Sequence, residues 1–406
     1  MPDIETKSEQ KDEDRIMELN FGRVEGLPPE EQQWLQELKY IYDYHRSANR
    51  KKRRYYNGKV TLNEVNLGIA LPAGLGKLEI GCAWGAKTVD VLAGRSMFDG
   101  FVTENGTKSE DMDQIMKRNH LIAEYNKAVK EELKYGCTFA AVSGEKDDAR
   151  VRFYSPHCAA ASWNAHEGRI RCGFAFEDAR RDESDVTWSP EHVNFYTDTD
   201  IWELDRIGGA WYATQNPHDF GEPLMVALIW DATNDKPFGQ SRLKEPVRRL
   251  IQGYVRTVAN ATIGLEFATS PQKYLLGVSD EQYDMLIDNK FKQYVGSILY
   301  STNNPETGEK PNFGQLSQGN IEPHVQMLRM LATQYSAATG LAVTDVGVIN
   351  DANPTSSEAI IAQSQTLILM AEQLNKSNGD ALYRIGRMAL AIELGFRMSF
   401  RKKHMS

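Results

Sequence analysis

The chain has 406 residues, 41% of them hydrophobic and 25% charged, which is typical of a soluble globular protein with length for two or three domains. No apolar run reaches the ~18 residues of a membrane span and the charged N-terminus lacks a signal-peptide core, so we expect a protein made and kept in a cytoplasm. The net charge of −9 argues against a protein that wraps nucleic acid with its whole surface, but it is compatible with one past which DNA slides.

The first half of the chain is predicted to pass from helices into a β-rich region. Residues 1–27 form an acidic tail that we expect to be disordered, and apolar spacing predicts helices over 28–54, 85–95 and 109–135. Between about 136 and 230, short segments such as CTFAAVSG, RVRFYS and PLMVALIW are separated by Gly, Asp, Asn and Pro. This pattern of short apolar segments separated by turn-forming residues predicts antiparallel strands.

Two long helices that bracket a small module are predicted in the second half. Ser241 can cap a helix that continues to about 268, and Gly253 and Gly264 on it permit close approach of another helix. A compact insertion over 270–320 follows, with a possible helix over 280–292 and a strand over 295–300, and a second helix spans 321–339.

The segment 340–354, GLAVTDVGVINDANP, interrupts the helices. Its Gly, Asp, Asn, Pro and β-branched residues favour turn or extended backbone, and the capping box Thr355-Ser-Ser-Glu358 then predicts the start of a long helix. A loop of this length is commonly functional or disordered.

Four cysteines match no zinc or disulfide spacing, and we expect free, mostly buried thiols. They are Cys82, Cys137, Cys158 and Cys172.

The motifs that could carry catalysis are incomplete. GCAWGAKT at 81–88 is similar to a phosphate-binding P-loop but does not match it, because Ala86 occupies the position of the second glycine. Asp198-Thr-Asp200 can in principle hold a divalent cation, although in a β-rich stretch Asp-x-Asp more often marks a turn. His157 and Cys158 would point to opposite faces of a strand. We therefore predict no catalytic residue, metal or cofactor, and an enzyme is the weaker interpretation.

The order of several motifs resembles the portal proteins of tailed bacteriophages, especially the branch of phages with long non-contractile tails. The similar segments are WGAKTVDVLAGRSMFDGF, KYGCTFAAV, RFYSPHCAAASW, PFGQSRLKEPVRRLIQGYVRTVANATIGLEFATSPQKYLLG and GLAVTDVGVINDANPTSSEAI. Each is weak alone, but the ordered set covers about 80–400.

The resemblance implies an α+β portal fold assembled as a ring, usually of twelve subunits. The implied parts are a wing over 28–240, stem helices over 241–269 and 321–339, a clip over 270–320 and a tunnel loop over 340–354. Long helices over 355–406 would return to the wing, with a minimal or absent crown.

The implied function is a DNA channel at one capsid vertex for packaging and ejection, which also nucleates capsid assembly. The implied partners are further copies of the chain, double-stranded DNA bound without sequence specificity, the terminase large subunit, a head-completion adaptor, and major capsid and scaffolding proteins. The protein would lie in the virion after assembly in the host cytoplasm, with no membrane. The alternatives are a nucleotide-dependent packaging enzyme and a capsid scaffold protein.

The implied site residues form two groups. The tunnel-loop group is Thr344, Asp345, Val346, Val348, Ile349, Asn350, Asp351 and Asn353. Its aspartates, repeated around a ring without any Lys or Arg in the loop, would repel phosphate and keep DNA centred, while its valines and isoleucine would pack between subunits. The stem group, lining the channel or subunit contacts, is Arg242, Lys244, Arg248, Arg249, Gly253, Arg256 and Gly264. Its basic residues face either the channel or neighbouring carboxylates.

Overall fold

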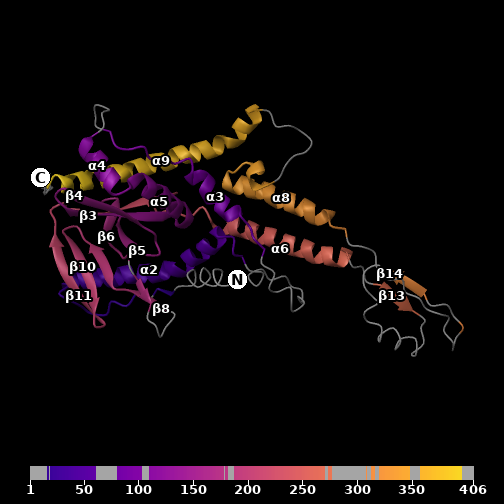
Figure 1. Ribbon diagram of the computed structural model, residues 1–406, viewed down its shortest axis with the longest axis horizontal. Coiled ribbons are helices and arrows are strands. Elements are labelled where there is room, and N and C mark those ends of the chain that lie inside the picture. Colours follow the sequence, from indigo (N-terminus) through magenta and orange to yellow (C-terminus); the bar gives the residue numbers. More distant parts are fainter. Residues whose placement is uncertain are drawn as a thin grey trace. The chain divides into compact units, whose positions relative to one another are not determined.

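The chain divides into two compact units. The computed structural model describes residues 16–17, 19–60, 80–102, 109–177, 179–181, 187–269, 273–276, 308, 312–315, 320–347 and 357–395. Unit 1 takes its residues from 1–59, 83–248 and 336–406, and unit 2 takes its residues from 60–82 and 249–335 (Figure 1).

The described residues of unit 1 form three sheets. The largest has the strand order β2 (Val24–Glu25), β11 (Ala210–Pro217), β10 (Asp200–Ile207), β9 (His192–Tyr196), β6 (Arg169–Ala175) and β5 (Ala159–Asn164). The second has the order β12 (Met225–Ile229), β3 (Cys137–Glu145) and β4 (Asp148–Tyr154), and the third β1 (Ile16–Met17), β8 (Thr187–Pro190) and β7 (Ala179–Arg181). Strands from β3 to β12 pair antiparallel with one another, which confirms the β-rich prediction for 136–230.

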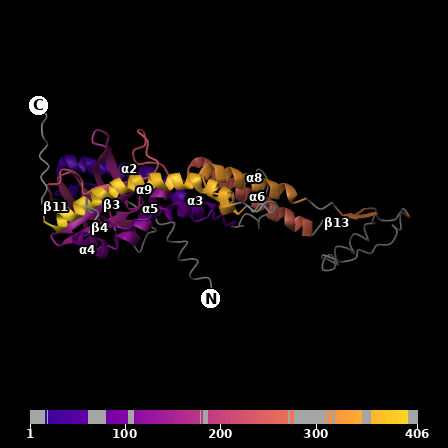
Figure 2. The same ribbon diagram turned by 90° about the horizontal axis from the view of Figure 1, so that it is seen from above.

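Five helices of unit 1 surround these sheets. They are α2 (Pro29–Tyr56), α3 (Trp84–Ala93), α4 (Glu110–Arg118), α5 (Leu121–Tyr135) and α9 (Ser357–Glu393). The helix α2 packs on β5 and β6, whereas α5 and α9 pack on β3 and β4. Figures 1 and 2 both show α9 running along the sheet that contains β3 and β4. Long helices with mostly antiparallel sheets make this an α+β fold, as predicted.

The segment 19–27 belongs to the core of unit 1. Leu19, Phe21 and Val24 are buried in the main apolar cluster, and the Phe21 ring lies 5.8 Å from the Phe174 ring. The indole of Trp211 donates to the carbonyl of Asn20 at 2.9 Å. The prediction of a disordered tail over 1–27 is therefore wrong for its last part, because three apolar side chains outweigh the charged residues around them. Residues 1–15 lie outside the described part.

The single helix predicted over 109–135 is two helices. His120 adopts a left-handed conformation with φ of 49°, which ends α4 and starts α5 at a new angle. The preceding Asn119 bridges this corner to β4, since its amide donates to Ala149 O at 2.9 Å and accepts from Val151 N at 3.0 Å. The helix is interrupted here by a contact with a residue 30 positions away, and the spacing of apolar residues cannot predict such a contact.

Unit 2 contains most of α6 (Glu245–Thr269) and α8 (Glu322–Thr339), together with an antiparallel pair of strands, β13 (Lys273–Leu276) and β14 (Asn312–Gln315). The helix α6 begins four residues later than predicted. Ser241 is not its cap: the hydroxyl donates to Lys134 O at 2.6 Å and accepts from Leu243 N at 2.9 Å. The helix and strand predicted over 280–300, and the side chains of the capping box at 355–358, lie outside the described part.

All four cysteines are free, as predicted. Cys82, Cys137 and Cys172 are buried and Cys158 is half-buried. Burial raises the pKa of Cys137 to about 12 and the pKa values of Cys158 and Cys172 to about 11. These thiols are therefore protonated near neutral pH and poorly suited to act as nucleophiles.

Candidate functional site

The helices α6 and α8 of unit 2 lie side by side in both ribbon views and form a helix pair (Figures 1 and 2). A Cβ atom placed on Gly253 of α6 would lie 3.2 Å from Leu331 Cδ2 of α8, tighter than an ordinary contact. The residues of unit 2 buried on the two helices include Ile251, Val255, Ala259, Leu331, Ala332 and Tyr335. Gly253, predicted as a channel or inter-subunit position, thus makes a helix contact within the chain.

Other apolar residues of this helix pair are exposed. Leu265 of α6 and Val325, Met327 and Met330 of α8 are between 37% and 47% exposed. Gly264 differs from Gly253, because an added Cβ would meet no atom of the described residues within 4 Å. The described part of unit 2 therefore has apolar surface on the helices for which the sequence predicted subunit contacts.

Arg242, in the segment before α6, joins three parts of unit 1. Its Nε donates to Thr88 O of α3 at 2.8 Å, and its Nη2 donates to Thr339 O, the last residue of α8, at 2.6 Å. Its Nη1 lies 3.3 Å from the sulfur of Met370 in α9. Only 7% of the residue is exposed, so its side chain does not face a channel, which was one of the two predicted alternatives. A guanidinium at the C-terminal end of α8 also complements the negative end of the helix dipole.

The other basic residues predicted near the stem have different surroundings. Lys244 is exposed and its Nζ lies 2.6 Å from a carboxylate oxygen of Asp231, which agrees with the carboxylate alternative within one chain. Arg248 is half-buried and donates to Leu243 O at 2.6 Å. Arg249 and Arg256 are exposed on the part of α6 that belongs to unit 2, and a channel-facing role for them stays a prediction.

The start of the predicted tunnel loop is a well-defined turn in unit 1. Gly340 follows α8 with a positive φ of 71°, the usual glycine position after a helix, and its Cβ position is crowded by Met370 Cε at 3.1 Å. The hydroxyl of Ser336 donates to Leu341 O at 2.6 Å, and Leu341 is buried. A 3₁₀ turn, η4 (Val343–Val346), comes next.

The 3₁₀ turn is fixed to α3 by Trp84. The buried indole Nε1 of Trp84 donates to Val346 O at 3.2 Å, and the Val346 side chain is itself buried. Asp345 accepts from Ala342 N at 3.3 Å, while Thr344 is exposed. The Val346 side chain is thus buried within its own chain, where η4 contacts α3, and packing of this loop between subunits stays a prediction. Val348, Ile349, Asn350, Asp351 and Asn353 lie outside the described part.

The alternative motifs have structural roles. Gly85, in the segment similar to a P-loop, lies inside α3. An added Cβ would be 2.1 Å from Tyr55 O of α2, so this glycine allows the two helices to be in contact. Asp200 accepts from Gln215 Nε2 at 2.8 Å at the turn between β9 and β10, which agrees with a turn rather than a cation site. Among the described residues, no cluster of three or more His, Cys, Asp or Glu could hold a metal ion. None of the described helices combines the length and apolar character that a membrane span requires.

The sequence pointed to the right segments but missed the contacts that organise them. Trp84 and Thr88 lie in the motif WGAKTVDVLAG and Arg242 lies in PFGQSRLKEP, yet nothing in either motif shows which carbonyl oxygens they reach. One feature of the sequence could have indicated these contacts. A Trp and an Arg in segments rich in small and apolar residues need hydrogen-bond partners when they are buried.

Three solved structures resemble the chain at low sequence identity. The chain is 14% identical to one in the virion of a native gene transfer agent particle, with a TM-score of 0.46 and coverage of 77% of this chain and 78% of that chain. It is 13% identical to a chain in the neck of the native particle computed with C12 symmetry, with a TM-score of 0.45 and the same coverages. The neck of the empty particle computed with C6 symmetry gives 13% identity, a TM-score of 0.48 and coverages of 84% and 87%.

The family comparison is decisive. No curated protein matches the chain. The model of a family described as phage portal protein, SPP1 Gp6-like, matches residues 35–399, which is most of the chain. The protein therefore belongs to the phage portal proteins, as the order of its motifs indicated.

Proposed function

We propose that copies of this chain assemble into a ring, expected to hold twelve, which forms the DNA channel at one vertex of a phage capsid. DNA enters through this channel during packaging and leaves through it during ejection. The observation that carries the proposal is the portal family match over residues 35–399.

The helix pair supports the assembly part of the proposal. The exposed side chains of Leu265, Val325, Met327 and Met330 give each subunit apolar surface that a neighbouring copy can cover. On this reading residues 28–240 are the wing, 241–269 and 321–339 the stem, 270–320 the clip, and 355–406 helices that return to the wing.

The segment 340–354 is proposed as the channel constriction. It contains Asp345 and Asp351 and no Lys or Arg, so a ring of such loops repels phosphate at short range and guides duplex DNA without gripping it. The contact between Trp84 and Val346 gives the loop a fixed starting point in unit 1.

The remaining partners follow from the same proposal. The clip would bind the terminase large subunit during packaging and a head-completion adaptor afterwards, and the ring would nucleate a shell of major capsid and scaffolding proteins in the host cytoplasm before it becomes part of the virion. The energy for DNA movement would come from the terminase. Turnover of ATP by the purified chain, with or without DNA, would favour a packaging enzyme instead.

A loop deletion tests the channel proposal. Deleting residues 348–350 spares Val346 and its contact with Trp84, so we expect rings of normal appearance in electron micrographs and reduced DNA packaging or retention in particles. The matched control is a deletion of the same length in the tail, residues 8–10, which should leave packaging unchanged. Loss of rings on deleting 348–350 would show that the loop is mainly a subunit contact.

A further inference from the structure

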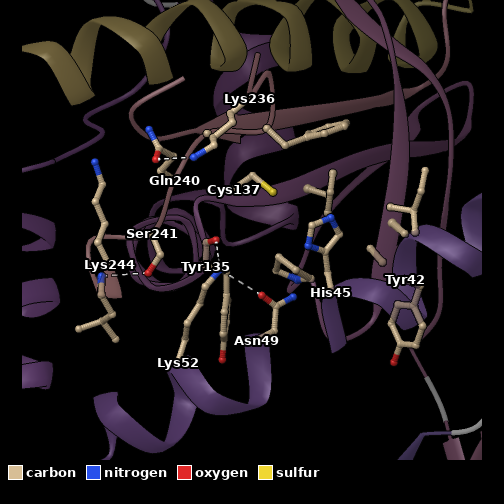
Figure 3. A pocket seen from close by; sticks show the side chains of 18 of the residues that line it. Tyr42, His45, Asn49, Lys52, Tyr135, Cys137, Lys236, Gln240, Ser241 and Lys244 are labelled. Atoms are coloured by element: carbon tan, nitrogen blue, oxygen red, sulfur yellow. Dashed lines mark hydrogen bonds between the residues drawn. The ribbon is translucent and has the colours of Figure 1, made fainter. Parts of the chain in front are cut away.

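Unit 1 contains a half-open cavity of about 500 Å³ that the channel function does not use. It lies between α2, the strands β3 and β5, and the segment that leads into α6 (Figure 3). Its apolar lining includes Ile41, Phe139, Ala160, Phe238 and Leu243. A volume of this size, mostly apolar walls and a few polar groups that point inward are the usual features of small-molecule sites.

Lys52 gives the cavity a polar centre. In Figure 3 its side chain and that of Asn49 rise from α2 toward Tyr135. Its Nζ donates to Tyr135 O at 2.9 Å and contacts Asn49 Oδ1 at 3.3 Å. An ammonium group has three N–H donors, so one remains for a ligand. No carboxylate of the described residues forms an ion pair with this ammonium group.

The charges around the cavity favour an anion. Lys52, Lys236, Lys244 and Arg248 line it, whereas Glu245 is the carboxylate among the lining residues. Lys236 Nζ contacts the neutral amide of Gln240 at 3.1 Å, and the exposed Lys244 pairs with Asp231, which is not part of the lining. The potential inside the cavity is therefore positive.

Lys52 also has an energetic reason to accept an anion. Burial is the main cause that lowers the pKa of Lys52 to about 8; Cys137 opposes this shift and the nearby Arg248 contributes to it. The charged form of this side chain is thus held in surroundings that disfavour it. A bound carboxylate would offset that cost by a charge-assisted hydrogen bond.

We propose that this cavity binds a small amphipathic carboxylate, with an aromatic or aliphatic body between Phe139, Phe238 and Ala160 and its carboxylate on the Lys52 ammonium. Ser241 and Glu245 also line the cavity. The ligand therefore contacts the segment that enters α6, and its site is separate from the tunnel loop.

A panel of four compounds tests the chemistry on the full-length, unmodified chain. The compounds are 5-phenylpentanoate, its neutral amide, 5-phenylpentylamine and acetate, and isothermal titration calorimetry measures the dissociation constants. We expect 5-phenylpentanoate to bind, the amide to bind about tenfold more weakly, and the amine and acetate to show no binding in the millimolar range. Binding of the amine as tight as that of the carboxylate, or no binding of the carboxylate, overturns the proposal.

Variants then locate the site. Lys52→Met should weaken binding of 5-phenylpentanoate about tenfold or more, and the exposed neighbour on α2 provides the control Lys51→Met, which should bind like the unmodified chain. Equal affinities for the two variants overturn the assignment to Lys52. Phe238→Ala tests the apolar wall independently and should also weaken binding. If Lys52→Met does not fold, Phe238→Ala and the compound panel decide together.

Discussion

Arg242 donates to the carbonyl oxygens of Thr88 in α3 and of Thr339 at the C-terminal end of α8. Buried carbonyl groups that lose their donor cost about 1–3 kcal/mol each. We therefore expect Arg242→Met to lower the free energy of unfolding by about 3 kcal/mol in urea denaturation. Lys244→Met is the control, because its exposed pair with Asp231 should contribute less than about 1 kcal/mol. Similar losses in both variants would show that the buried contacts of Arg242 are not what matters.

Glu132 gives the chain a pH-dependent stability. This fully buried residue of α5 accepts from Asn378 Nδ2 of α9 at 2.8 Å, and burial raises its pKa to about 8, although the Asn378 hydrogen bond opposes the shift. The folded state therefore binds the proton more tightly than the unfolded state, whose pKa is near 4.5. The contribution of this group to stability is complete below that lower value and is lost as pH rises to about 8.

Glu132→Gln tests this titration, because glutamine keeps the shape and cannot lose a proton. Relative to the unmodified chain, the variant should gain on the order of a few kcal/mol in free energy of unfolding between about pH 5 and about pH 9. Urea denaturation at several pH values measures the difference. Parallel pH profiles for the two proteins would rule out a neutral, buried Glu132.

At the scale of elements, the indole of Trp84 holds η4 against α3. Trp84→Phe removes that donor while keeping an aromatic ring, and we expect about 1 kcal/mol less protection of the backbone amides of Asp345 and Gly347. Hydrogen exchange with mass spectrometry measures this. Trp211→Phe is the matched control, since its indole donates to Asn20 O in a different part of unit 1. Unchanged exchange over 340–347 in Trp84→Phe would mean that other contacts fix the turn.

The two glycines of α6 are expected to behave differently. Gly253→Leu forces a side chain against Leu331, so it should destabilise the helix pair by about 1–3 kcal/mol even in an isolated subunit. Gly264→Leu meets no atom of the described residues and improves helix propensity, so the subunit should stay folded, but a ring that uses this face should be lost. Thermal unfolding and size-exclusion chromatography separate the two effects. Rings of normal size in Gly264→Leu would place subunit contacts elsewhere.

Local patterns were sufficient for most elements. The Pro28-Pro29 pair and the spacing of Leu35, Leu38 and Tyr42 placed α2 within two residues of its ends, and α8 was placed within one. The sequence could not show contacts between distant residues. Arg242 lies 154 positions from Thr88, and Trp84 lies 262 positions from Val346, so no periodicity records either bond. For the same reason the sequence could not show that Gly253 contacts Leu331 of the same chain, and its predicted place at the channel or between subunits stays a prediction.

For the whole molecule, we propose that this portal family member works as a ring. Each subunit has apolar side chains exposed on α6 and α8, and hydrophobic surface of this kind is commonly covered by a partner. In a closed ring, each copy covers surface on its neighbour and no end is left to grow. A scaffold protein with the same exposed residues would instead give open assemblies.

Electron microscopy of the purified full-length chain tests this claim most directly. We predict closed rings of uniform size with a central hole, present without DNA, terminase or capsid protein. Class averages should also show one rotational symmetry, with twelve-fold symmetry expected. Assembly as a closed ring would be contradicted by single subunits at concentrations at which portals are expected to assemble. Filaments or shells without a central channel would contradict it as well.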